Sequence, residues 1–204
     1  NVKNNFGRIE HYFDGIDDNI LLSIGHSGID NDDTFGSIIL INEQKKYSET
    51  FAKGLRGVLG IYADENLILA VDNGPKGGDE LNKIVKDKNY GWPKVSFGTR
   101  YLHDNKGKSI LISHENNGFE PPLVALVPSV AISSVNQCPL ILKNYYKKNC
   151  LMALSLHGNK LRPGKSIIIF LLNEGMDKVQ SVEKIYFVNL DNFKFRHFIT
   201  NSKN

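Results

Sequence analysis

Four carboxylic acids, several glycines and two aromatic residues share one short stretch, "DNGPKGGDELNKIVKDKNYGWP", which runs from Asp72 to Pro93. Glycine can adopt positive φ and proline fixes its own φ, so such a loop can turn sharply and direct carbonyl oxygens inward. Calcium prefers oxygen ligands of both kinds, carboxylate and carbonyl. The candidate carboxylate ligands are Asp72, Asp79 and Glu80, and the candidate carbonyl ligands are Gly74, Pro75 and Tyr90.

The same stretch has a second interpretation that involves no metal. Asp79 is a residue type that caps helix N-termini, and the residues after it could form a helix of one or two turns near Asp79–Lys86. The spacing is compatible with a calcium loop and with a capped turn, so both interpretations stay open at this point.

Composition excludes some classes of protein. The chain has 204 residues, of which 41% are hydrophobic and 23% charged, as expected for a globular domain. The net charge of +3 is too small for a nucleic-acid-binding surface. The longest apolar run, "SIIIFLL", falls short of the roughly 20 residues that span a bilayer. We therefore expect a single domain over residues 1–204, with no membrane span and no nucleic-acid partner.

The two cysteines, Cys138 and Cys150, match no zinc-binding pattern. They are either buried thiols or a disulfide that closes the "PLILKNYYKKN" loop, and a disulfide would require an oxidising compartment. Within this loop, "NYYKKN" at Asn144–Asn149 is interpreted as a solvated hairpin tip.

The apolar pattern predicts strands. Short segments rich in Ile, Val, Leu or aromatics, bounded by Gly, Asn, Asp or Pro, lie at 19–28, 36–42, 58–63, 66–74, 121–135, 150–156, 166–174, 182–189 and 193–200. A strand–turn–strand pattern recurs loosely at 7–28, 58–74 and 182–200, with turns such as "ADEN" and "LDN". Frequent short strands with a weak repeat favour an all-β fold of the β-propeller type.

The order of the motifs carries a family resemblance. "GPKGGDELN" followed by "NYGWPKVSFG" resembles the signature of the soluble quinoprotein glucose/sorbosone dehydrogenases. "FGRIEHYFDGIDDNILLSIGHSG", "DTFGSIILIN", "EPPLVALVPSVAISSV" and "LMALSLHGNKL" resemble further segments of that family in the same order. The resemblance covers nearly the whole chain, and it corresponds to the C-terminal part of a full-length member.

Membership would imply a six-bladed β-propeller that is exported to the periplasm or outside the cell. It would also imply calcium and pyrroloquinoline quinone, which accepts two hydrogens as a sugar C1 hydroxyl is oxidised to a lactone. The cofactor carries the redox chemistry, while the protein supplies orientation, charge and a histidine base.

The resemblance assigns metal and substrate residues. Carbonyls of Gly74 and Pro75 would hold the calcium that bridges to the quinone. Glu80 and Tyr90 would hold a second calcium. Asp79 matches the Asp beside that Glu and is assigned to the substrate.

The resemblance also assigns cofactor residues. Arg56 would lie over the quinone and Ser129 would contact it. His157 takes the place of a basic residue that pairs with a cofactor carboxylate. The "KVQS" segment stands where the family has R-x-R-D, so it places Lys178 and Gln180 at the two guanidinium positions.

The chain departs from the family pattern at several positions. The base position falls on Asn4, an amide that does not accept a proton at neutral pH, so His157 becomes the remaining candidate for the base. The His before the quinone-stacking Arg is replaced by Leu55, and one guanidinium by Gln180. Losing bidentate carboxylate partners weakens binding of a tricarboxylate cofactor.

These substitutions leave two functional hypotheses. The chain belongs either to a quinone-dependent sugar dehydrogenase or to a catalytically degenerate propeller that binds sugar or serves as a scaffold. At about 45–60 residues per blade, the sequence predicts an incomplete arc of about four blades. Open strand edges then favour pairing, so we expect N-terminal extension of the chain or blades supplied by another chain.

Overall fold

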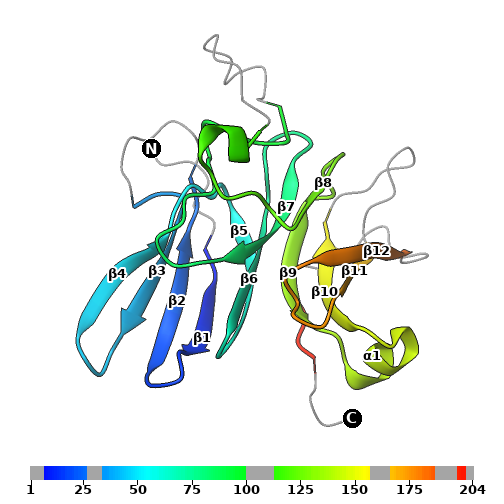
Figure 1. The fold of residues 1–204 in the computed structure, drawn as a ribbon, viewed down its shortest axis with the longest axis horizontal. Coiled ribbons are helices and arrows are strands. Elements are labelled where there is room, and N and C mark those ends of the chain that lie inside the picture. Colours follow the sequence, from blue (N-terminus) through cyan, green and yellow to red (C-terminus); the bar gives the residue numbers. More distant parts are fainter. Residues whose placement is uncertain (1–6, 27–33, 100–112, 157–165, 187–196, 201–204) are drawn as a thin grey trace.

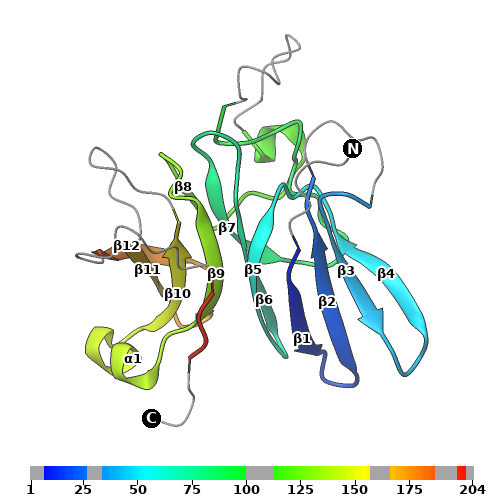
Figure 2. The same cartoon turned by 180° about the vertical axis from the view of Figure 1, so that it is seen from behind.

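The computed structural model describes residues 7–26, 34–99, 113–156, 166–186 and 197–200. These residues form three four-stranded antiparallel sheets, each a meander of strands consecutive in sequence. The sheets stand side by side in an arc, each presenting an edge to the centre (Figures 1 and 2). The all-β prediction and the blade architecture of a β-propeller are confirmed.

The first blade contains β1 (Ile9–Phe13), β2 (Asp18–Ile24), β3 (Ser37–Asn42) and β4 (Tyr47–Ala52). In β2 buried side chains alternate with partly exposed ones, as a strand with one face toward the core requires. The hairpin β1–β2 is the first of the repeated strand–turn–strand units expected from the sequence.

The second blade contains β5 (Val58–Asp64), β6 (Leu67–Asp72), β7 (Asp79–Ile84) and β8 (Val124–Leu126). Every residue of β6 is buried. Its alternate side chains enter two different apolar clusters, one toward the first blade and one toward the third. The second blade is therefore covered on both faces, which explains the unbroken apolar sequence of β6.

The third blade contains β9 (Ile132–Gln137), β10 (Asn149–Ser155), β11 (Ser166–Leu172) and β12 (Val179–Tyr186). Its hairpin β9–β10 is interrupted by the helix α1 (Leu140–Tyr146). This insertion explains why the sequence repeat does not extend to this hairpin. The predicted repeat at 182–200 lies mostly outside the described residues.

Two local predictions were wrong. The helix expected near Asp79–Lys86 is strand β7, because this segment pairs with β6 on one side and with β8 on the other. The expected hairpin tip at Asn144–Asn149 is the end of α1 followed by β10. The only other helix among the described residues is a short 3-10 turn, η2 (Glu115–Asn117).

The alternatives for the cysteines are resolved in favour of a disulfide. Cys138 and Cys150 are bonded to each other at the two ends of the loop that carries α1. The backbone N–H of Cys138 also donates to the carbonyl of Cys150. The helix is thereby fixed to the sheet at its base.

The described residues contain three blades where the length predicts about four. The segment between β7 and β8 spans about forty residues of the sequence, and long connections of this kind reduce the number of blades. Within the described segments, no helix has the length and hydropathy needed to cross a bilayer.

Candidate functional site

Three buried carboxylates meet where β6 ends and β7 begins, and we call Asp72, Asp79 and Glu80 the acidic corner. Asp72 is the last residue of β6 and stands directly opposite Glu80 in the sheet register. All three side chains are buried, with exposures of 4%, 0% and 6%. Carboxylates are rarely this buried without partners, so each one needs an explanation.

Asp72 organises the backbone of the loop before β5. Its two oxygens accept hydrogen bonds from the N–H of Arg56, at 2.8 Å, and from the N–H of Gly57. Burial raises the pKa of this carboxyl, while these hydrogen bonds and the Arg56 charge act in the opposite direction. Asp72 therefore has a structural role at the corner.

Asp79 ties the second blade to the third. One oxygen accepts from the Ser129 hydroxyl at 2.7 Å, and the other accepts from the N–H groups of Val130 and Ile132, both at 2.9 Å. The side chain is completely buried. Both oxygens of Asp79 hold the segment that enters β9, and its expected contact with the substrate stays a prediction.

Glu80 has weak polar partners in the described part of the chain. Asn82 donates to one of its oxygens at 3.3 Å, and the Nε2 atom of His114 lies 3.8 Å from the other, beyond hydrogen-bond distance. Burial, followed by the charge of Asp72, raises the pKa of Glu80 to about 8. A bound cation would replace the proton that Glu80 otherwise holds near neutral pH.

His114 is a site residue that the sequence analysis missed. It is 3% exposed, stacks on Phe97 with ring centroids 5.0 Å apart, and burial lowers its pKa. Its Nδ1 atom and the Oδ1 atom of Asn82 have no hydrogen-bond partner among the described residues. No local signal marks His114, since it lies far from Glu80 in sequence and reaches it through the fold.

Arg56 lines the same small cavity as Asp72 and Glu80. Its Nη1 donates to the carbonyls of Asn73, at 2.7 Å, and Gly74, at 3.0 Å. Its guanidinium carbon stands 5.6 Å from the ring centroid of Trp92, and the indole N–H of Trp92 donates to His26. The guanidinium is held by carbonyls and a ring, so it provides a fixed positive charge.

The carbonyls of Gly74 and Pro75, the expected ligands of a bridging calcium, already accept hydrogen bonds. Gly74 accepts from Arg56, and Pro75 accepts from the N–H of Gly78 at 3.1 Å. A Cβ atom at Gly74 would lie 1.6 Å from the Gly78 carbonyl oxygen, so this turn requires glycine. A guanidinium on the Gly74 oxygen disfavours a second cation there, and the fit of this first calcium is poor.

The second expected calcium fits better. Glu80, Asp72 and Tyr90 help to line a cavity of about 10 Å³ below the glycine turn, which is room for roughly one water-sized sphere. The phenol of Tyr90 donates to the carbonyl of Lys83 and accepts from the N–H of Val85. Tyr90 is 2% exposed, so its side chain is packed within the fold.

The remaining predicted cofactor residues do not all lie at the acidic corner. Ser129 lies at the corner, but its hydroxyl donates to Asp79 and accepts from the N–H of Ala131. Lys178 precedes β12, at the end of the third blade where Leu172 pairs with Val179. Ser129 lies at the other end, about 20 Å away along the strands. Lys178 therefore does not join Arg56 and Ser129.

Three further predicted positions are Gln180, Asn4 and His157. Gln180 lies within β12 near Lys178, so it is also remote from the corner. Asn4 and His157 lie outside the described residues, so the position of the expected base stays a prediction. Among the described residues, no group of three or more His, Cys, Asp or Glu is arranged so that it could hold a metal ion.

Comparison with known proteins finds a matching family profile and two similar curated proteins, of which one is named as a dehydrogenase. The family profile "Glucose / Sorbosone dehydrogenase" matches residues 30–166, which is more than half of the chain. An uncharacterized protein of Synechocystis, slr1608, is 34% identical over 46% of this chain and 23% of its own length. The aldose sugar dehydrogenase YliI of Escherichia coli is 31% identical over 47% of this chain and 26% of its own. The chain thus matches about a quarter of each curated relative.

Solved structures share the fold at lower identity. The apo aldose sugar dehydrogenase of E. coli has a TM-score of 0.66 and 23% identity, with 94% of this chain and 56% of that chain covered. The PQQ-bound aldose sugar dehydrogenase of Streptomyces coelicolor has a TM-score of 0.59 and 18% identity, with 88% and 48% covered. These similarities identify the fold, with this chain spanning about half of each structure.

Proposed function

The chain belongs to the glucose/sorbosone dehydrogenase family, and we propose that it forms part of a quinone-dependent sugar dehydrogenase. The proposed reaction oxidises the C1 hydroxyl of an aldose to a lactone, with pyrroloquinoline quinone as oxidant and calcium at the acidic corner. When bound, the quinone would accept the two hydrogens of the sugar.

One observation carries this proposal: a fixed guanidinium stands beside a buried carboxylate pair. Arg56 is held over Trp92 by the Asn73 and Gly74 carbonyls, and the buried Asp72 and Glu80 line the same cavity as Arg56. Such a corner offers positive charge to an anionic cofactor and negative charge to a cation. Arg56 and Trp92 would contact the quinone, and Glu80 with the Tyr90 main chain would hold calcium.

Quinone binding tests the cofactor assignment. The full-length protein is titrated with pyrroloquinoline quinone in the presence of calcium, and the quinone absorbance is followed. We expect saturable binding, and bleaching of the bound quinone when aldoses are added. Absence of binding at high micromolar quinone would refute the proposal.

An Arg56→Gln variant tests whether the Arg56 guanidinium binds the quinone. Loss of a charged hydrogen-bond donor costs about 1.5–3 kcal/mol, so quinone affinity should fall at least about tenfold. The matched control is Lys53→Gln, which removes an exposed positive charge from the first blade. Equal affinities for the two variants would contradict the assignment of Arg56.

Calcium binding is tested separately by melting temperature. Calcium at a hundredfold excess over its Kd should stabilise the protein by about 2.7 kcal/mol. Glu80→Gln keeps the size of the side chain and should abolish the effect, while magnesium should give a smaller one. A calcium shift that persists in Glu80→Gln would place the cation elsewhere.

A second candidate function is a sugar-binding or scaffold module without turnover. Leu55, which replaces the family's histidine, is 1% exposed and packs in the cluster between the first two blades. It offers no polar group beside Arg56. In this case sugars bind, as calorimetry would detect, but no bound quinone is bleached.

We also propose that the protein acts in the periplasm or outside the cell. The disulfide between Cys138 and Cys150 supports an oxidising compartment. Cell fractionation with an antibody against the protein tests this location.

A further inference from the structure

The helix α1 has an apolar face that the described residues leave uncovered. Leu140, Ile141 and Tyr145 are 54%, 74% and 77% exposed. Ile141 and Tyr145 are four positions apart and share the outer face of the helix. Leu142 and Tyr146 pack instead against the apolar cluster around the disulfide. The exposed residues are therefore additional to those that fix the helix to the blade.

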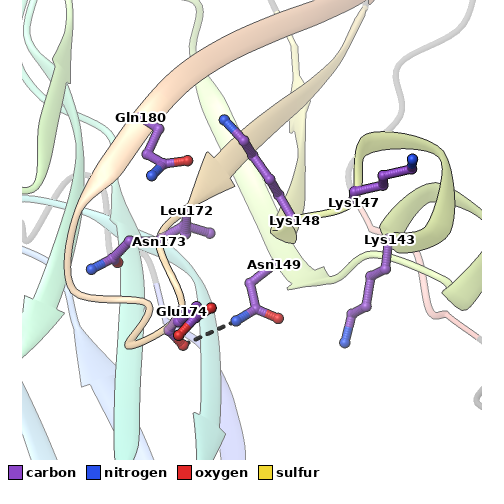
Figure 3. A pocket seen from close by; sticks show the side chains of 8 residues that line it. All are labelled: Lys143, Lys147, Lys148, Asn149, Leu172, Asn173, Glu174 and Gln180. Atoms are coloured by element: carbon purple, nitrogen blue, oxygen red, sulfur yellow. Dashed lines mark hydrogen bonds between the residues drawn. The ribbon is translucent and has the colours of Figure 1, made fainter.

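Basic side chains border this apolar face. Three lysines line an open pocket of about 480 Å³ between α1 and the β11–β12 turn, with Glu174 as the only carboxylate among its lining residues (Figure 3). The members of the pocket are Lys143, Lys147, Lys148, Asn149, Leu172, Asn173, Glu174 and Gln180.

The lysines do not converge on one point. In Figure 3 the side chains of Lys143, Lys147 and Lys148 point in different directions. Lys143 also donates to the Gln137 side chain at 2.8 Å. A single small anion would contact one ammonium group at a time, so the three lysines distribute positive charge around α1 and do not form a site for a small anion.

The disulfide makes this surface rigid. Cys138 precedes α1 and Cys150 follows it, so the loop is closed at its base. Binding through a preformed surface avoids the entropic cost of ordering a loop. The helix protrudes at the end of the third blade away from the acidic corner (Figures 1 and 2).

We propose that the outer face of α1 and its lysines, Lys143, Lys147 and Lys148, bind the surface of an anionic lipid bilayer. Exposed Ile, Leu and Tyr side chains suit the boundary between headgroups and acyl chains, and flanking lysines attract anionic headgroups. A soluble polyanion would engage the lysines but would gain nothing from Ile141 and Tyr145. This inference is independent of the proposed dehydrogenase function.

Vesicle binding by the full-length protein tests the proposal. Cosedimentation is measured with phosphatidylcholine vesicles and with vesicles that also contain phosphatidylserine. We expect binding to the phosphatidylserine vesicles, weakened by salt because of screening. No binding to these vesicles, or equal binding to both kinds, would overturn the proposal.

Two double variants separate the contributions of the apolar residues and of the lysines to vesicle binding. Ile141→Ser with Tyr145→Ser should lower the partition coefficient at least about tenfold. Lys147→Gln with Lys148→Gln should lower it about thirtyfold, at roughly 1 kcal/mol for each lysine. Melting temperatures verify that each variant is folded.

Matched controls lie on the first blade. Ile16, which is 83% exposed in the β1–β2 turn, is changed to Ser, and Lys46 and Lys53 are changed to Gln. These variants should bind within about twofold of the original protein. Binding that survives the Ile141→Ser and Tyr145→Ser changes, and that heparin competes away, would indicate a general polyanion site and refute lipid binding.

Discussion

At the scale of single residues, the acidic corner divides its three carboxylates between structure and ligand binding. Asp72 and Asp79 hold backbone N–H groups of neighbouring segments. Glu80 accepts only a long hydrogen bond from Asn82 among the described residues, and its pKa is raised to about 8. Glu80 is therefore the carboxylate best suited to bind a cation.

The raised pKa of Glu80 predicts how stability changes with pH in calcium-free buffer. The folded protein holds this proton up to about pH 8, while the unfolded chain releases it near the ordinary value of 4.5. Stability should fall as pH rises between these values, by up to about 1.4 kcal/mol per pH unit. Urea unfolding from pH 5 to 9 should show a shallower decline for Glu80→Gln, and parallel curves would contradict this.

Asp79→Ala should strongly destabilise the protein. The change leaves the buried N–H groups of Val130 and Ile132 without an acceptor and removes the bond to Ser129. We expect a loss of at least about 3 kcal/mol in the free energy of unfolding, measured in urea. Ser129→Ala removes one of the three bonds and should cost about 1 kcal/mol. Similar costs for both variants would show that the backbone bonds matter little.

At the scale of elements, the polar strand β7 shows how neighbours override local preference. Its sequence, "DELNKI", contains few residues that favour strands. Pairing with β6 and β8 nevertheless makes it a buried strand, which positions Asp79 and Glu80 at its start.

Removing the disulfide should destabilise the third blade. The bond joins residues 12 positions apart, and closing a loop of about this size contributes about 3 kcal/mol. Cys138→Ala with Cys150→Ala should therefore lower the free energy of unfolding by about 2–4 kcal/mol. The original protein should show the same loss under dithiothreitol, while the variant should be insensitive to it. An effect of dithiothreitol on the variant would contradict this explanation.

At the scale of the whole molecule, the blades contact one another in two ways. The first strands of neighbouring blades, β1, β5 and β9, lie against one another, and apolar clusters fill the space between the sheets. Gly60 of β5 approaches Ser134 and Val135 of β9 so closely that a Cβ atom would lie 2.5 Å from the Val135 nitrogen. The acidic corner and the helix α1 lie at opposite ends of these blades. The two sites proposed above are therefore separate on the molecule.

Gly60→Ala tests the contact between the second and third blades. The added methyl group meets main-chain atoms, so we expect a loss of about 1–3 kcal/mol in urea unfolding. Gly175→Ala is the control, because its nearest neighbour would be the Asp177 side chain at an ordinary 3.5 Å. Equal stability of both variants would show that β5 and β9 can move apart without a loss of stability.

The sequence by itself determined the strands with strong apolar patterns, the first two inner hairpins and the glycine turn at Gly74. It also contained the motifs that identify the family. These features depend on local preferences and on residue order, which a sequence displays directly.

Only the tertiary structure decided that the segment Asp79–Ile84 is a strand, that the two cysteines form a disulfide, and which groups surround Glu80. It brought His114 to Glu80 and separated Lys178 from Ser129. Such features depend on contacts between residues distant in sequence, where burial and pairing outweigh local preference. This is why the corner could be located from the sequence, while the roles of its carboxylates could not.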